Sequence, residues 1–136
     1  MRWSECIKSG LVERRAKDKE LAKSLFKMAV DRFEFFSSKE TSIFTLEGIY
    51  ESILELCHSL LSLEGFKTLS HECAIEFLRN KCLNDYETEL LDKLRKRRHG
   101  AKYYGELLSE AVIKKNIDNG TMIFLKVKTF VEKKLS

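Results

Sequence analysis

The sequence predicts an all-α protein, an up-and-down bundle of about five helices, and three observations indicate that class. The chain of 136 residues contains no proline, which helix interiors exclude because it lacks an amide donor and clashes with the preceding turn. Apolar residues recur at steps of three and four, the spacing that gathers them on one helical face. Hydrophobic residues make up 43% and charged residues 34%, which is typical of a folded domain with a solvated surface. We expect one domain over residues 1–136, with residues 1–12 loosely packed.

The first two predicted helices form an antiparallel pair. The first covers about residues 13–36, and its apolar positions share one face: Leu21, Leu25, Met28, Ala29, Phe33 and Phe36. The second covers about residues 42–64 and is apolar nearly all round, so it is either central and contacted on several sides or part of a dimer interface. We expect a homodimer that uses this helix or its hairpin partner. Gly65 ends the second helix, because glycine adopts a left-handed conformation at no cost.

Three further helices complete the predicted bundle. Ser70 is placed to cap a third helix, and Glu72 is favoured by the positive end of its dipole. A break at residues 80–84 separates this helix from a fourth, which begins at about Asp85. The last helix lies near the end of the sequence, and its start is open, because residues 116–120 read as a break or as an early turn.

The four cysteines are scattered and form no C-x-x-C pair: Cys6, Cys57, Cys73 and Cys82. Zinc sites need closely spaced ligands, so no metal is expected, and we expect no cofactor. A domain with this much apolar sequence needs no disulfide, and Cys57 is expected in the core. No apolar run reaches the roughly 20 residues of a membrane span, and residues 1–10 lack the apolar region of a signal peptide. We expect a cytoplasmic protein in a reducing compartment, with no membrane association.

A basic segment at residues 93–105 is the candidate for the chemistry. It contains four cations of interest and two tyrosines: Arg95, Arg97, Arg98, Lys102, Tyr103 and Tyr104. Cations near a helix C-terminus are favoured by the dipole, so one interpretation is a solvated surface. The other is a polyanion site, because a guanidinium binds phosphate through a planar fork of donors and tyrosine offers a stacking face.

Two parts of the chain carry a family resemblance. Residues 65–78, with the sequence GFKTLSHECAIEFL, are similar to the stretch that joins the second and third helices of small archaeal and bacterial HEPN domains (higher eukaryotes and prokaryotes nucleotide-binding domains). Arg98, His99 and Tyr103 resemble the motif on the fourth helix of that family, an Arg followed after four to six residues by His or Tyr. The resemblance covers about residues 17–135.

The resemblance implies a five-helix bundle that usually dimerises about its central helices. Many members are metal-independent ribonucleases, in which the Arg stabilises phosphate charge and a His acts as acid and base. Others are the toxin or helper partner of a minimal nucleotidyltransferase. This chain carries Tyr103 where the ribonucleases carry His, and a tyrosine with an ordinary pKa of about 10 is a poor general base at neutral pH.

Two hypotheses follow. The first is an RNA- or nucleotide-binding module of a toxin–antitoxin or nucleotidyltransferase-partner type, with little catalysis of its own. Its nucleic-acid- or nucleotide-binding residues are Arg95, Arg97, Arg98, Lys102 and Tyr104. The second is a metal-independent endoribonuclease in which Arg98 acts with His99 or Tyr103.

The geometry of a regular helix separates Arg98 from Tyr103, because a five-residue step turns by about 500°, or 140° past a full turn. We expect either that Gly100 loosens the helix or that a dimer axis brings the two residues together. Tyr103 would then donate a hydrogen bond or accept a modifying nucleotide on its hydroxyl. His58 and His71 are expected to be structural.

Overall fold

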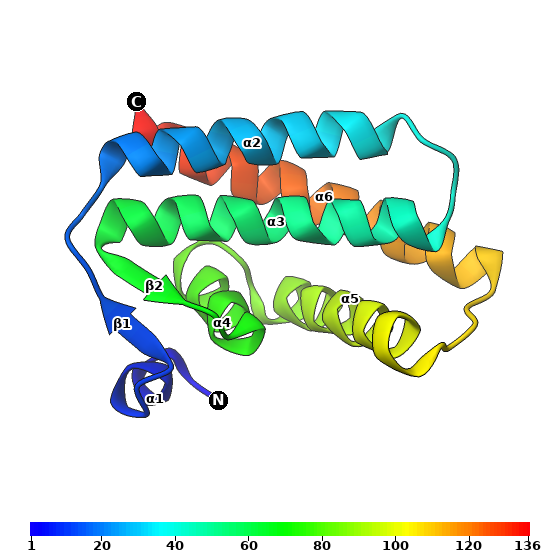
Figure 1. Ribbon diagram of the computed structural model, residues 1–136, viewed down its shortest axis with the longest axis horizontal. Helices are drawn as coiled ribbons and strands as arrows, with labels where there is room; N and C mark the ends of the chain where they lie inside the picture. Colours follow the sequence, from blue (N-terminus) through cyan, green and yellow to red (C-terminus); the bar gives the residue numbers. More distant parts are fainter.

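The computed structural model describes residues 1–136 and is helical apart from one small sheet (Figure 1). Five helices form the bundle: α2 (Lys19–Ser37), α3 (Ile43–Glu64), α4 (His71–Lys81), α5 (Asp85–Tyr104) and α6 (Glu110–Leu135). A short helix, α1 (Trp3–Lys8), precedes them. The strands β1 (Val12–Arg14) and β2 (Phe66–Thr68) pair antiparallel. The predicted all-α class is confirmed, with an additional short helix and a two-stranded sheet.

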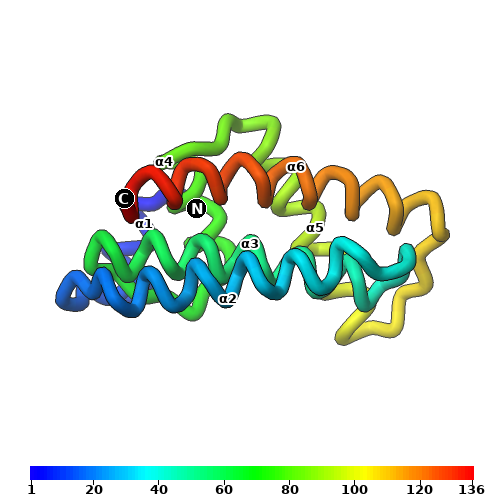
Figure 2. The backbone as a smooth tube through the Cα atoms, turned by 90° about the horizontal axis from the view of Figure 1, so that it is seen from above, coloured from blue at the N-terminus to red at the C-terminus, as the bar shows by residue number.

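The helix α3 lies at the centre of the bundle. Its side chains are buried around most of the helix, and Leu46, Ile49, Ile53, Leu56 and Leu60 are fully inaccessible to solvent. Figure 2 shows α2 and α6 running alongside it, and α4 and α5 pack on its other side. Of the two interpretations of its apolar surface, the central position is therefore the observed one. The surface that was expected to drive dimerisation through α3 is covered within a single chain.

The apolar face of α2 is only partly buried. Ala29 belongs to the core, and Phe33 stacks on Phe124 of α6 with ring centroids 4.0 Å apart. Leu21 and Met28, predicted to be on the same buried face, are 46% and 53% exposed. The prediction was wrong for these two because α3 and α6 cover a narrower strip of α2 than the apolar pattern spans.

One helix start differs from the prediction, and another resolves a start that the sequence left open. The first long helix begins at Lys19 rather than residue 13, because residues 12–14 pair with residues 66–68 as a strand and the Asp18 side chain accepts a hydrogen bond from the Leu21 amide. The last helix begins at Glu110, so residues 116–120 are helical. Gly120 lies inside it, where the absence of a side chain admits Ile49 of α3.

The predicted boundaries between α3 and α5 are confirmed. Gly65 ends α3 with a φ of 88°, in the left-handed region. Ser70 caps α4 by accepting a hydrogen bond from the Cys73 amide, and α4 ends at Lys81 before α5 begins at Asp85.

The N-terminal segment, expected to be loose over residues 1–12, packs on the bundle through Trp3, Cys6 and Val12, while most of its other residues are exposed. The Trp3 ring lies 5.4 Å from Phe66 and 4.9 Å from Phe77, centroid to centroid. Cys6 is buried and forms a disulfide with Cys73, with Cα atoms 5.9 Å apart across 67 residues of sequence. Their separation in the sequence hid this pairing. Disulfides persist mainly in oxidising compartments, whereas the sequence predicts a reducing one. The cytoplasmic location therefore stays a prediction that this bond does not support.

Cys57, by contrast, is a free thiol in the core, as predicted, and its thiol donates a hydrogen bond to the Ala74 carbonyl. None of the helices combines the length and hydropathy that a membrane span requires.

Candidate functional site

The second half of α5 and the first turn of α4 form a small pocket of about 290 Å³, which we call the cation pocket. Its lining residues are His71, Arg95, Arg98, His99 and Tyr103. Four of them come from α5, and His71 comes from α4. The sequence prediction had assigned Arg95, Arg98, His99 and Tyr103 to a site, and the structure brings these four together.

The α5 helix reaches Tyr104 without a break at Gly100. The prediction that Gly100 loosens the helix was therefore wrong. Gly100 is buried, and it leaves room for the Glu106 side chain to fold back against it. On a regular helix Arg98 and Tyr103 point about 140° apart, and His99 points between them. The His99 ring centroid lies 4.8 Å from that of Tyr103, so the cation pocket extends across this angle.

Arg98 is the most enclosed cation of the pocket, with a side chain only 12% exposed. Its Nη2 donates a hydrogen bond of 3.0 Å to Glu51 Oε1 on α3, and its guanidinium lies 5.8 Å from the centre of the Tyr50 ring. Its Nε is buried without any partner. Buried donors are normally satisfied, so this guanidinium is incompletely paired within the chain.

Arg95 is balanced by two acids. Its Nε donates to Asp92 Oδ1 at 2.8 Å, and its Nη2 lies 3.7 Å from Glu72. Burial alone would raise the pKa of Asp92, but the hydrogen bonds from Arg95 and Lys96 hold it below its ordinary value. The cation pocket therefore has little excess positive charge, and carboxylates already occupy part of its donor capacity.

His71 is the residue that sequence reasoning missed. The hydroxyl of the buried Tyr50 lies 3.1 Å from His71 Nδ1. Burial raises the pKa of Tyr50, so the phenol keeps its proton, while burial and the nearby Arg98 lower the pKa of His71. With Nδ1 engaged by Tyr50, Nε2 is the nitrogen of this neutral ring left for a ligand. No local pattern shows that the first turn of α4 faces α5, so the sequence contains no signal for this role.

Three predicted binding residues lie outside the cation pocket. Arg97 is exposed on another face of α5. Tyr104 is 74% exposed and contacts the site only through the His99 ring, at 5.5 Å between centroids. Lys102 lines a neighbouring cavity instead.

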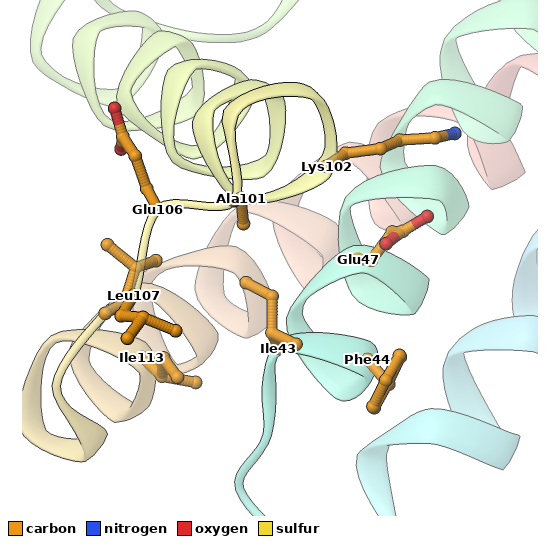
Figure 3. A pocket seen from close by; sticks show the side chains of 10 residues that line it. Ile43, Phe44, Glu47, Ala101, Lys102, Glu106, Leu107 and Ile113 are labelled. Carbon is orange, nitrogen blue, oxygen red and sulfur yellow. The ribbon is translucent and has the colours of Figure 1, made fainter.

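That neighbouring cavity, which we call the apolar pocket, has a volume of about 480 Å³ and is shown in Figure 3. Its apolar wall comes from four segments of the chain: Ile43 and Phe44, Ala101, Leu107 and Leu108, and Ile113. Glu47 and Lys102 lie at one side, on α3 and α5.

No family model matches the chain, and no curated protein and no solved structure is similar enough to match it. The HEPN resemblance therefore stays a prediction, and the function has to be argued from the site. No group of three or more His, Cys, Asp or Glu side chains is arranged to hold a metal ion. Arginine, neutral imidazole and phenol groups are instead donors suited to an anion.

Proposed function

We propose that this chain is an RNA- or nucleotide-binding module that holds a phosphate in the cation pocket, with little catalysis of its own. The observation that carries the proposal is the convergence of Arg95, Arg98 and His71, from two helices, on one small pocket. Guanidinium groups bind phosphate oxygens through two parallel donors, and such charge-assisted bonds are about twice as strong as neutral ones. Arg98 is also incompletely paired within the chain, because its buried Nε has no partner.

The surroundings of the pocket support a polymer or nucleotide over a bare ion. Tyr103 and Tyr104 are 59% and 74% exposed, and exposed rings give bases a face on which to stack. Lys102, one turn beyond Arg98 on α5, is a further exposed cation that a chain of phosphates can contact.

A matched pair of substitutions tests the proposal. Arg98→Ala removes a pocket cation, whereas Arg97→Ala removes the same charge from the exposed face of the same helix. By anisotropy with labelled single-stranded RNA at low salt, Arg98→Ala should weaken binding about tenfold or more, since a hydrogen bond to a charged group contributes about 1.5–3 kcal/mol. Arg97→Ala should change it by only about a few-fold. Arg98→Lys keeps a charge beside Glu51 and serves as the control for folding.

Salt provides an independent check on the same proposal. Log affinity should fall linearly with log salt concentration, with a slope of about 0.7 for each phosphate contacted on a single strand. Absence of RNA binding by the wild-type chain at low salt would contradict the proposal and leave the basic segment as a solvated surface.

The HEPN resemblance extends the proposal to partners and location. It implies a toxin–antitoxin or nucleotidyltransferase-partner protein, in keeping with the cytoplasmic location expected from the sequence. The exposed Tyr103 side chain is open to transfer of a nucleotidyl group from a nucleoside triphosphate, with pyrophosphate as the leaving group. A homodimer through α2 is supported by the exposed Leu21, Met28 and Phe35, which recur at seven-residue steps on one side of that helix. Sedimentation of a monomer at micromolar concentration would exclude this dimer. Incubation with a minimal nucleotidyltransferase and labelled nucleotide tests the modification of Tyr103, with Tyr103→Phe as the control.

A second candidate function is metal-independent RNA cleavage by Arg98 with His99 or Tyr103. The observation in its favour is that His99 and His71 line the same pocket as Arg98, which supplies two imidazoles for acid–base chemistry. Cleavage of RNA by the purified chain in EDTA, abolished by Arg98→Ala and His99→Ala but retained by Arg97→Ala, would establish it in place of the binding-only function.

A further inference from the structure

The apolar pocket exposes side chains that soluble domains usually cover. Phe44 is 74% exposed and Leu107 is 99% exposed, and both line the pocket from opposite sides. Its volume of about 480 Å³ falls within the range of about 300–1,000 Å³ that small-molecule sites occupy. Exposed apolar surface of this kind marks a site for a ligand or a partner.

The apolar pocket adjoins the cation pocket along the contact between α3 and α5. These helices run antiparallel, with Arg98 bonded to Glu51. One turn further along, Glu47 and Lys102 line the apolar pocket. Four residues of helix correspond to about 6 Å, so Lys102 at the apolar pocket follows Arg98 at the cation pocket by about one helical turn. Tyr103, the residue after Lys102, lines the cation pocket.

We propose that the apolar pocket receives the base of the nucleotide whose phosphate lies in the cation pocket. The proposal rests on the function proposed above and adds the ligand class: a nucleotide unit with its base attached, rather than a phosphate or sugar phosphate. One helical turn is within the reach of a nucleotide from its phosphate to its base. The exposed Phe44 ring and the flanking aliphatic side chains provide the flat apolar contact that a base requires.

Charge disfavours a second phosphate in the apolar pocket. The Glu47 carboxylate lies at its side and Lys102 is its only cation, whereas the Glu106 carboxylate points away from it toward Gly100. Like charges close together are unfavourable in a partly enclosed site. The neutral, planar part of a nucleotide is therefore the part that this pocket accepts.

Two oligomers separate base binding from phosphate binding: a labelled six-nucleotide oligoadenylate and an abasic oligomer with the same number of phosphates. The wild-type chain should bind the oligoadenylate about tenfold or more tightly than the abasic oligomer, because stacking of one base contributes about a factor of ten. Phe44→Ala should reduce that difference, leaving only the share that stacking on Tyr103 and Tyr104 contributes, and should leave abasic binding unchanged. Ala101→Phe, which fills the pocket from α5, should do the same. Tyr86→Ala removes an aromatic side chain that is 65% exposed at the other end of α5, and it should have no effect.

The outcomes distinguish this proposal from the one on which it rests. Equal binding of both oligomers by the wild-type chain, or an unchanged preference in Phe44→Ala, overturns base binding, while weakening of both oligomers by Arg98→Ala still supports the phosphate site. A Phe44→Ala variant that alters sedimentation but not oligoadenylate binding also overturns it and assigns the apolar pocket to a protein partner. Absence of binding of either oligomer by the wild-type chain overturns both proposals.

Discussion

The Tyr50 hydroxyl and the Nδ1 atom of His71 lie 3.1 Å apart, and this contact joins the core of α3 to the first turn of α4 at the wall of the cation pocket. Tyr50 is fully buried, whereas His71 is only partly covered. A protonated phenol within the core therefore orients an imidazole that a ligand can reach. The contact makes the geometry of the site depend on how α3 packs against α4.

Tyr50→Phe is expected to weaken both the fold and the site. The substitution keeps the ring but leaves His71 Nδ1 without its partner, so the free energy of unfolding should fall by about 1 kcal/mol. RNA affinity should also fall, because the imidazole is no longer held. Chemical denaturation and anisotropy measure the two effects. Tyr86→Phe, at an exposed position, is the control and should change neither quantity. Full stability in Tyr50→Phe would show that the hydrogen bond contributes nothing.

Glu51→Gln is expected to strengthen anion binding. The Glu51 carboxylate occupies one donor of Arg98 in the free chain, so an incoming phosphate competes with it. Because partly exposed ion pairs contribute about 0.2–1 kcal/mol, removal of the charge should tighten RNA binding up to about fivefold. Glu55→Gln is a matched control one turn along α3, where the carboxylate pairs with Arg32 instead. Weaker RNA binding by Glu51→Gln would mean that Glu51 positions Arg98 rather than competing for it.

Stability should fall as the pH decreases below about 6.5. Burial lowers the pKa of both His71 and His58 from the ordinary value of 6.5, with Arg98 also acting on His71 and His71 on His58. Below 6.5 the unfolded chain takes up protons that the folded chain does not, so unfolding becomes easier. The loss begins near pH 6.5 and is complete below the folded pKa values. Denaturant titrations between pH 7.5 and 5 should show this decline. The variant His58→Gln/His71→Gln should be nearly flat over that range, and an equal decline in the variant would assign the effect to other groups.

Reduction of the Cys6–Cys73 bond should destabilise the chain. The bond closes a loop of 67 residues, and a chain-entropy treatment gives a contribution of about 4 kcal/mol for a loop of this size. Addition of a thiol reductant should lower the free energy of unfolding. The reductant should also change the fluorescence of Trp3, the single tryptophan, which packs on Phe66 and Phe77 beside the bond. The double variant Cys6→Ser/Cys73→Ser should give no response to the reductant.

The parts of the fold that were predictable are those fixed by neighbouring residues. Gly65 indicates the end of α3 and Ser70 the start of α4, because left-handed backbone and side-chain capping depend only on neighbouring residues. The strand at residues 12–14 was not predictable, because three residues make no pattern and their partner lies more than 50 residues away. The Cys6–Cys73 bond was missed for the same reason.

Only the part of the candidate site whose residues are close together in the sequence was predictable. Arg95, Arg98, His99 and Tyr103 are close in sequence, and a single helix presents them together. His71 and Glu51 belong to other helices, and only the packing of α3, α4 and α5 brings them to the pocket. The apolar pocket is built from four segments, so no single stretch of sequence indicates it.

The central position of α3 also determines how the chain responds to deuterated solvent. Amide protons of a helix enclosed by its neighbours are released only when those neighbours separate, whereas outer helices open locally. The middle of α3 should therefore exchange at the rate of global unfolding, and the ends of α5 and α6 much sooner. Tyr50 belongs to the slowly exchanging region, and the basic end of α5 belongs to the faster one. The cation pocket therefore lies where the most stable part of the molecule meets a part that opens more readily and can adjust to a ligand.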